Sequence, residues 1–181
     1  MLYPLPPVMV SCGTMEKPNI ITAAWTGTVN SEPPMTYVSV RPERYSHAMI
    51  KESGEFVINL TTERLTRAAD LCGVKSGRDV QKFRLCRLTP APASAVSAPL
   101  IAESPVNIEC RVEQCLQLGS HDMFLARVIA VNVNESLLDA RGTLRLDRAG
   151  LVAYVHGSYR ALGRELGKFG FSVRKKQEAK R

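Results

Sequence analysis

Apolar and polar residues alternate along much of this chain, and the alternation predicts a protein built mainly from short strands. In the clearest stretch, 106–113, the even positions from Val106 to Val112 are apolar and the odd positions are polar. A period of two is typical of a strand with one buried face. The next strand, at 128–133, has Ile129 and Val131 on one face. We expect further strands at 8–12, 19–25, 35–41, 55–60 and 151–156.

Helical spacing is confined to a few short stretches. Apolar residues at positions 65, 68, 69 and 72 share one helix face, after candidate N-caps Thr61 and Thr62. We expect a second helix at 46–54 and a short third one that starts at Asp79. Strands do not alternate regularly with long helices, so a mainly β fold, a barrel with a few short helices, is favoured over a doubly wound sheet.

The length of 181 residues predicts one domain, and the net charge of +7 indicates an anionic partner. That partner is a nucleic acid, an anionic membrane surface or a phosphorylated small molecule. The last eight residues carry +4 of the charge. We therefore expect a single domain over 1–173 and a disordered basic tail over 174–181.

The cysteines and histidines do not form a metal-ligand pattern. The five cysteines have no CxxC spacing, and the three histidines are not clustered with them. This favours reduced thiols in a cytoplasmic protein with no metal site. The first residues lack a secretory signal pattern, and no apolar run of about 18 residues occurs, so no membrane partner is expected.

Three segments have residues suited to a phosphorylated ligand, although GxxxxGK[ST] and GxGxxG are both absent. Arg44 and Ser46 stand where a strand gives way to a helix, where free N–H groups and a guanidinium can hold phosphate. A plain helix cap is the alternative. The segment 75–83 has a Ser76-Gly77 turn followed by Lys82, which equally suits an ordinary charged turn. In 19–27, small residues surround Trp25, the single tryptophan, which suits either a planar ligand or the core.

Taken in order, these motifs resemble one family. Its motifs here are 19–27, Arg44-x-Ser46, 55–59, Ser76-Gly77-x-Asp79-x-x-Lys82-Phe83, 108–110, Gly119-Ser120-His121 and Tyr159-x-x-Leu162-Gly163. The chain resembles the flavin reductase-like family of FMN-binding split barrels, in particular its flavoredoxin branch, over about residues 8–172. Each motif is short, and it is their joint order that is specific.

The resemblance implies FMN as the cofactor and assigns residues to it. Those expected to bind FMN are Thr22, Ala23, Ala24, Trp25 and Thr26 along the ring, Arg44, Ser46 and Lys82 at the phosphate, Asn59 facing the flavin, and Ser76, Gly77 and Phe83 at the closing loop. Asn59 stands opposite the apolar face of its strand, so the alternation lets it leave the core.

His121 matches the catalytic histidine of a Gly-Asp-His triplet in related reductases, although here the triplet is Gly-Ser-His followed by Asp122. The resemblance thus implies an FMN-dependent oxidoreductase that passes electrons from NADH, NADPH or a redox protein to an acceptor. It also implies a homodimer with the flavin at the subunit boundary. The main alternative is a flavin carrier without turnover. A nucleic-acid-binding barrel is disfavoured because no strand interleaves aromatic and basic residues.

Overall fold

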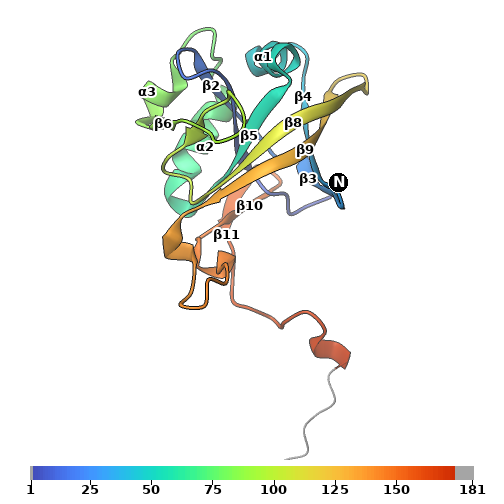
Figure 1. Ribbon diagram of the computed structural model, residues 1–181, viewed down its shortest axis with the longest axis vertical. Helices are drawn as coiled ribbons and strands as arrows, with labels where there is room; N and C mark the ends of the chain where they lie inside the picture. The colour runs from blue at the N-terminus through green and yellow to red at the C-terminus, as the bar shows by residue number, and fades with distance from the viewer. Residues whose placement is uncertain (1, 174–181) are drawn as a thin grey trace, which may run out of the picture.

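The computed structural model describes residues 2–173, and its centre is one curved antiparallel sheet. Within these residues seven strands pair in the order β2-β1-β5-β8-β9-β4-β3 (Figure 1). The strands of this sheet are β1 (Val8–Gly13), β2 (Pro18–Ala23), β3 (Thr26–Ser31), β4 (Pro34–Val40), β5 (Glu55–Leu60), β8 (Val106–Gln117) and β9 (Asp122–Val133). This arrangement confirms the mainly β prediction and all the expected strands of the sheet.

The strand register brings the two edges of the sheet toward each other. The long pair β8 and β9 runs from Val106 opposite Val133 to Gln117 opposite Asp122, and β4 continues the sheet beyond β9. A two-residue link, Ala24–Trp25, joins β2 to β3 on the far edge. The Ser39 N–H of β4 donates to the Trp25 carbonyl at 2.9 Å. The sheet is therefore a barrel that stays split beside this link.

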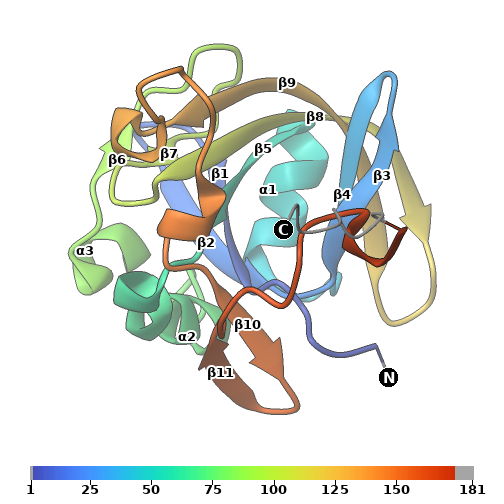
Figure 2. The same ribbon diagram turned by 90° about the horizontal axis from the view of Figure 1, so that it is seen from below.

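Two layers of helix flank the sheet, one inside its curve and one outside. Figure 2 shows the sheet curling around α1 (Tyr45–Ser53), while α2 (Thr66–Val74) and α3 (Lys82–Cys86) lie on the other side of β1 and β2. Short 3₁₀ turns occur at Glu63–Leu65, Glu135–Leu137, Leu146–Arg148 and Phe171–Val173. Each side of β1 and β2 is covered, so both of their faces are buried.

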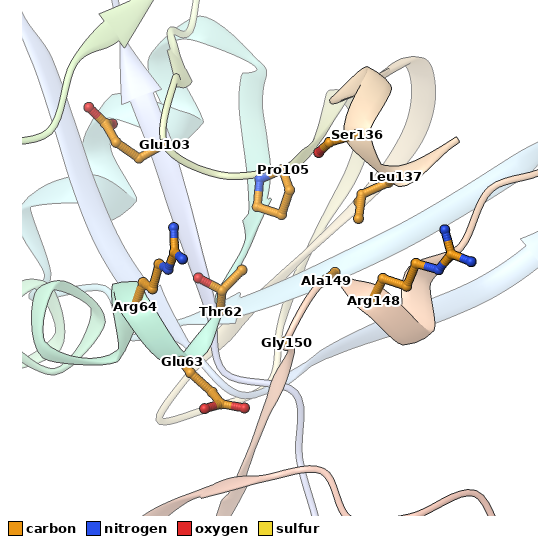
Figure 3. A pocket seen from close by; sticks show the side chains of 10 residues that line it. All are labelled: Thr62, Glu63, Arg64, Glu103, Pro105, Ser136, Leu137, Arg148, Ala149 and Gly150. Atoms are coloured by element: carbon orange, nitrogen blue, oxygen red, sulfur yellow. The ribbon is translucent and has the colours of Figure 1, made fainter. Parts of the chain in front are cut away.

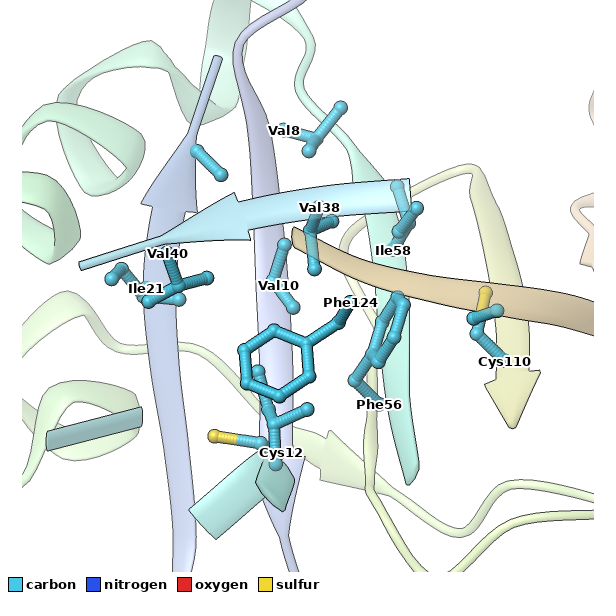
Figure 4. Close-up of a cluster of buried hydrophobic side chains, with 13 residues drawn as sticks. Val8, Val10, Cys12, Ile21, Val38, Val40, Phe56, Ile58, Cys110 and Phe124 are labelled. Atoms are coloured by element: carbon cyan, nitrogen blue, oxygen red, sulfur yellow. The ribbon is translucent and has the colours of Figure 1, made fainter. Parts of the chain in front are cut away.

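The inner core fills the barrel with side chains from opposite walls. Phe56 of β5 and Phe124 of β9 are fully buried and lie near Val10 of β1 (Figure 4). Ile50 of α1 belongs to the same cluster, so the helix closes one end of the barrel. Burial of such side chains contributes roughly 1.5–3 kcal/mol each.

A second core lies between the outer face of β1 and β2 and the helices α2 and α3. Met9 and Ile20 enter it from the strands, and Ala69, Cys72 and Phe83 enter it from the helices. Within each strand, alternate residues point into opposite cores. The even positions of β1 and the odd positions of β2 enter the inner core, and Met9 and Ile20 enter the second. This double use explains why the strand pattern at 8–12 and 19–23 is nearly continuous rather than alternating.

A buried carboxylate fixes the connector that follows α3. Glu109 of β8 has no exposed surface, and its carboxylate accepts hydrogen bonds from Ser94 N–H, Ser94 Oγ, Ala95 N–H and Asn132 Nδ2. Burial acts to raise the pKa of Glu109, but the hydrogen bonds outweigh it, so the pKa is lowered. The short strands β6 (Pro90–Ala91) and β7 (Leu100–Ile101) pair on either side of this connector.

The last part of the chain forms a hairpin and an extended segment. Strands β10 (Val152–Val155) and β11 (Ser158–Ala161) pair with each other, and Leu5 bridges to Tyr154. Beyond β11 the chain runs away from the barrel (Figure 1), and Phe169 on this segment is fully exposed. The basic tail expected at 174–181 lies outside the described residues.

The helices differ from the sequence prediction at two of their starts. The third helix begins at Lys82 instead of Asp79, because Asp79 N–H and Val80 N–H both donate to the Ser76 carbonyl and form a separate turn. The expected cap Thr62 precedes a 3₁₀ turn, and no cap bond from its side chain occurs in the described chain. The helix at Tyr45–Ser53 agrees with its prediction to within one residue.

Candidate functional site

One sizeable cavity contains none of the residues predicted to bind a ligand. It has a volume of about 450 Å³ and lies between the 3₁₀ turn at Glu63–Leu65, the end of β7 and the 3₁₀ turns near Ser136 and Arg148. Figure 3 shows that the guanidinium groups of Arg64 and Arg148 do not converge on one point. The Glu103 carboxylate is already bonded to Thr89 N–H at 3.0 Å. This cavity therefore has no clear arrangement for one ligand.

Two smaller cavities adjoin each other along β2 and share Ile21 and Arg44. The first, of about 330 Å³, lies between the start of α1 and the loop before α3; the second, of about 160 Å³, lies at the split between β2 and β4. We call them the anion cavity and the ring cavity. Ten of the thirteen predicted site residues line one or the other: Thr22, Ala23, Ala24, Trp25, Arg44, Ser46, Ser76, Gly77, Lys82 and His121.

The start of α1 forms one wall of the anion cavity. Arg44 is the N-cap, its side chain makes no cap hydrogen bond within the described residues, and the first turn contains no acidic residue. Ser46 is 2% exposed, and its Oγ accepts from Asn19 Nδ2 at 2.8 Å. The hydroxyl hydrogen of Ser46 is thus left to donate. Free N–H groups and the positive end of the helix dipole favour an anion here.

The loop before α3 forms the opposite wall and brings further positive charge. Arg78 lies over the Tyr45 ring at 5.6 Å and donates from Nη1 to the Glu43 carbonyl at 3.0 Å. Gly77 packs so closely that an added Cβ would meet the Asn19 side chain and would lie 2.7 Å from Tyr45 Cδ1. The absence of a side chain at 77 thus keeps the two walls together.

Lys82 closes the base of the anion cavity from α3. Only 3% of the residue is exposed, and its Nζ donates to the carbonyls of Ile20 at 2.6 Å and Cys72 at 2.7 Å. Burial lowers the pKa of Lys82, and the nearby Cys72 and Cys12 thiols oppose that effect. Three donor hydrogens and two carbonyl partners leave one donor for a ligand.

The ring cavity is shallow, and its walls come from backbone and from two stacked rings. The rings of Trp25 and His121 lie 4.4 Å apart between centroids at an angle of 43°. The exposed fraction of Trp25 is 51%. On the other ring, His121 Nδ1 lies 3.0 Å from Ser120 Oγ. Burial, followed by the positive charge of Arg41, lowers the pKa of His121, which favours the neutral imidazole.

One buried pair links the two cavities. His47 Nε2 of α1 lies 2.8 Å from Asp122 Oδ2 at the start of β9, and both side chains are less than a tenth exposed. The Phe124 ring packs against the imidazole at 5.1 Å between centroids. Since Asp122 follows His121, this pair fixes the backbone beside the ring cavity to the helix that starts at the anion cavity.

Three of the predicted residues lie outside both cavities. Thr26 is 8% exposed and donates to the Tyr37 carbonyl, and Phe83 is buried in the second core. Asn59 does stand opposite the inner core, as its position in the strand predicts, but the expectation that it leaves the core is wrong. Segment 99–101 covers this face, and Asn59 bonds to Met9 O, Ser11 Oγ and Ile101 N–H.

The structure also brings together residues that sequence reasoning did not select. Asn19 lies between Ser46 and Gly77 and contacts both. Both Arg78 and Lys75 line the anion cavity, and Ser39 lines the ring cavity. Asn19 and Arg78 lie within motifs that the sequence highlights, but their type alone does not separate them from their neighbours. Only the packing of β2 against the loop before α3 reveals them.

This arrangement fits a ligand with an anionic end and a flat end. The anion cavity offers the Arg44 guanidinium, the Lys82 ammonium and the Ser46 hydroxyl, and the ring cavity offers the backbone of β2 beside an aromatic ring. A phosphate joined to a planar heterocycle matches both ends in charge and shape. Among residues 2–173 there is no cluster of three His, Cys, Asp or Glu side chains able to hold a metal ion.

Across the part of the chain with described structure, we find no helix of a length and apolarity that would span a membrane.

Comparisons with known proteins agree on one kind of fold. Residues 1–163 match the family described as "Flavin reductase like domain". A protein of Archaeoglobus fulgidus is 33% identical over 77% of this chain and 78% of its own length. The flavoredoxin of Desulfovibrio vulgaris (Miyazaki F) superposes with a TM-score of 0.89 at 32% identity, covering 96% of this chain and 95% of that one. The flavoredoxin of Methanosarcina acetivorans has a TM-score of 0.87 at 28% identity, covering 96% and 95%.

Proposed function

Because this chain belongs to the flavin reductase-like domain family, and therefore to the flavin-binding oxidoreductases, we propose that it is an FMN-dependent oxidoreductase. It passes electrons from a reduced nicotinamide or a protein donor through FMN to an acceptor. The observation that carries the proposal is the junction of the anion cavity with the ring cavity at Arg44 and Ile21. A flavin mononucleotide has a phosphate at one end and a ring system at the other. The anion cavity suits the phosphate, and the adjoining ring cavity suits the ring system.

The phosphate belongs in the anion cavity. Arg44 and Lys82 supply positive charge, and the Ser46 hydroxyl and the first N–H groups of α1 supply hydrogen-bond donors. Ser76 and Gly77 close over the chain that joins phosphate and ring. Phe83 packs beneath this loop in the second core. These donors gather in one cavity, which supports a cofactor with a single phosphate group such as FMN.

The ring cavity receives the flavin ring against residues 22–25 of the chain, and Thr26 follows directly after them. Thr22 and Thr26 bond to Ala69 O and Tyr37 O, so they hold the strand path, while Ala23 and Ala24 leave room for a plane. FMN, when bound, supplies the redox chemistry by accepting a hydride and releasing its electrons. The His121 imidazole, whose Nδ1 lies 3.0 Å from Ser120 Oγ, offers its other ring nitrogen at the edge of this cavity. Asn59 holds β5 against β1 through its buried hydrogen bonds, and its role is to position these strands rather than to contact the flavin.

The proposal extends to the assembly and the compartment. We infer that residues 1–173 form one domain that pairs with a second copy, because Ile129 and Val131 of β9 present 37% and 53% of their surface. A contiguous patch of exposed apolar side chains often marks a protein–protein contact. The five unpaired thiols suit the reducing cytoplasm. Light scattering should give a molar mass twice that of one chain. The Val131→Lys variant should have the molar mass of a single chain.

The test of the cofactor compares two flavins, FMN and riboflavin. Purified protein should be yellow, and the flavin released by denaturation should be FMN. Titration of the protein freed of flavin should give FMN an affinity at least about tenfold above that of riboflavin, since riboflavin lacks the phosphate. Equal affinity for the two would contradict the anion cavity as the phosphate site. A colourless protein that also fails to bind added FMN would overturn the whole proposal.

The donor is decided by a separate measurement. Anaerobic titration with NADH and NADPH should bleach the flavin absorbance, and steady-state oxidation of the nicotinamide should exceed the rate with free FMN. The open ring cavity and the lack of a GxGxxG loop predict weak nicotinamide binding. If the bound flavin is reduced only by a protein donor, or not at all, the protein is an electron carrier without nicotinamide turnover.

A further inference from the structure

Two thiols lie side by side at the base of the anion cavity. Cys72 of α2 and Cys86 at the end of α3 have their Sγ atoms 3.7 Å apart. Cys72 has no exposed surface and lines the anion cavity, while Cys86 is half-buried. The other buried thiols have different surroundings. Cys12 donates to Asn19 O and Cys110 donates to Ile108 O.

The position of this pair distinguishes it from ordinary core packing. A disulfide requires the two sulfur atoms to approach by less than ~2 Å from their present separation. The two cysteines flank the loop that contains Ser76 and Gly77, and Lys82 at the start of α3 lies between them in the sequence. Lys82 Nζ already bonds the carbonyl of Cys72 at 2.7 Å, so α2 and α3 are held together at this point.

We propose that Cys72 and Cys86 form a reversible disulfide that ties together the two ends of the cofactor-binding loop. The reaction is exchange with a small disulfide such as oxidised glutathione. The Cys86 thiolate attacks one sulfur of that disulfide, and one thiolate leaves. Cys72 then loses its proton and attacks the Cys86 sulfur, which releases the second thiol. The two protein thiols are oxidised by two electrons, and one small disulfide is reduced to two thiols.

The two cysteines have different roles in this exchange. Cys86 attacks first because it is the one that solvent reaches. Burial, followed by the neighbouring Cys86, raises the pKa of Cys72 to about 12, so Cys72 reacts only by proximity once Cys86 carries the mixed disulfide. Cys86 also faces the Ala68 carbonyl at 3.9 Å, which holds its sulfur beside α2.

The disulfide should tighten the binding of FMN, an effect that rests on the proposed function. A closed ring from 72 to 86 reduces the freedom of the loop before FMN arrives, so less order has to be gained on binding. We expect the dissociation constant for FMN to fall roughly 3- to 10-fold in the oxidised protein. By linkage, bound FMN should favour the disulfide over the dithiol by the same factor.

The experiment equilibrates the full chain with reduced and oxidised glutathione, with and without FMN. Mass spectrometry should find the loss of two hydrogens and a linked pair of peptides containing Cys72 and Cys86. Without FMN, the oxidised form should unfold about 5 °C higher. Cys86→Ser and Cys86→Ala should abolish both changes, whereas Cys115→Ser, a change at another half-buried cysteine, should leave them intact.

Three other outcomes would each contradict a particular part of the proposal. A glutathione adduct on Cys86 with no linked peptide would overturn the disulfide itself. A disulfide that leaves the FMN dissociation constant unchanged would overturn its coupling to the loop. If neither form binds FMN, the proposed function fails, but the linked peptide and the higher unfolding temperature still decide whether the disulfide exists.

Discussion

The two adjoining cavities are built in opposite ways. Around the anion cavity, Ser46 and Lys82 are almost fully buried, and their polar atoms are bonded to Asn19, Ile20 and Cys72. Around the ring cavity, Trp25 is half exposed and His121 is held by its Ser120 neighbour and by stacking. One end is preorganised and closed, and the other is open.

This difference assigns a different task to each end. A preorganised, desolvated set of donors binds an anion strongly because little reorganisation is needed. An open face lets reactants approach and leave. Changes at the anion cavity should therefore alter the affinity for FMN, and changes at the ring cavity should alter the rate of electron transfer. The following variants test that division, from the largest expected effect on affinity to the smallest.

Replacing Lys82 by Met should have the largest effect. The change removes a positive charge from the anion cavity and leaves the buried carbonyls of Ile20 and Cys72 without their donor. We expect a loss of about 2–4 kcal/mol in the free energy of unfolding and a weakening of FMN binding beyond roughly 100-fold. Lys51→Met, at an exposed position on α1, is the control. Urea unfolding measures the free energy of unfolding, and flavin titration measures the FMN affinity. Unchanged FMN affinity in Lys82→Met would remove Lys82 from the site.

Gly77→Ala should weaken FMN binding by roughly 10- to 100-fold, the range of overpacking effects. The new methyl group would push against Asn19 and Tyr45 and separate the walls of the anion cavity. Gly163→Ala is a matched control, because a Cβ there meets nothing within 4 Å. Fluorescence titration measures the affinity. Equal affinities in both variants would show that the two walls need not stay in contact.

Ser46→Ala should weaken FMN binding by roughly 5- to 30-fold and leave riboflavin binding unchanged, because it removes one hydroxyl donor to an anion. Ser53→Ala, at the other end of the same helix, is the control. The ratio of the two flavin affinities is the informative quantity. A parallel loss for both flavins would indicate a packing defect and not a lost phosphate contact.

His121→Ala should leave FMN affinity within about threefold and slow flavin reduction by NADH or NADPH roughly 10- to 100-fold. His121→Gln keeps a polar group at the position and should recover part of the rate. Stopped-flow absorbance under anaerobic conditions measures reduction. A large loss of affinity with an unchanged rate would reverse the roles assigned to the two cavities.

Arg41→Ala should have the smallest effect on affinity and should raise the pKa of His121 toward its usual value. Burial is the main cause of the lowered pKa, and the Arg41 charge is the second, so only part of the shift should be lost. The imidazole would then begin to gain its proton at a higher pH than in the parent. An NMR titration of the His121 ring protons measures the change, and an unaltered midpoint would exclude Arg41 as a cause.

The sequence predicts the strands of the barrel well because their alternation reflects two separate cores. Val10 and Phe56 follow the inner core, while Met9 and Ile20 follow the outer one. The start of α3 was not predictable, since it depends on the turn that Ser76 O makes with the N–H groups of Asp79 and Val80. A charged stretch gives no signal for that turn.

The candidate site was predicted less evenly. Arg44, Ser46 and Lys82 have the residue types of an anion site, and the structure brings them together. Asn59 was misplaced because alternation tells which face a residue is on and not what covers that face. Asn19 could not be selected because its importance comes from contacts with Ser46 and Gly77, which are distant in sequence.

The buried Glu109 has a consequence for how freely residues 92–97 of the connector between β6 and β7 can vary. Its carboxylate captures the main-chain N–H groups of Ser94 and Ala95, and every residue type except proline offers such a group. The path of the connector is therefore specified from a strand fifteen residues away, while most of its own sequence carries little information. Substitutions along it should be tolerated wherever an N–H remains, and a single amide in place of the Glu109 carboxylate should loosen the whole segment.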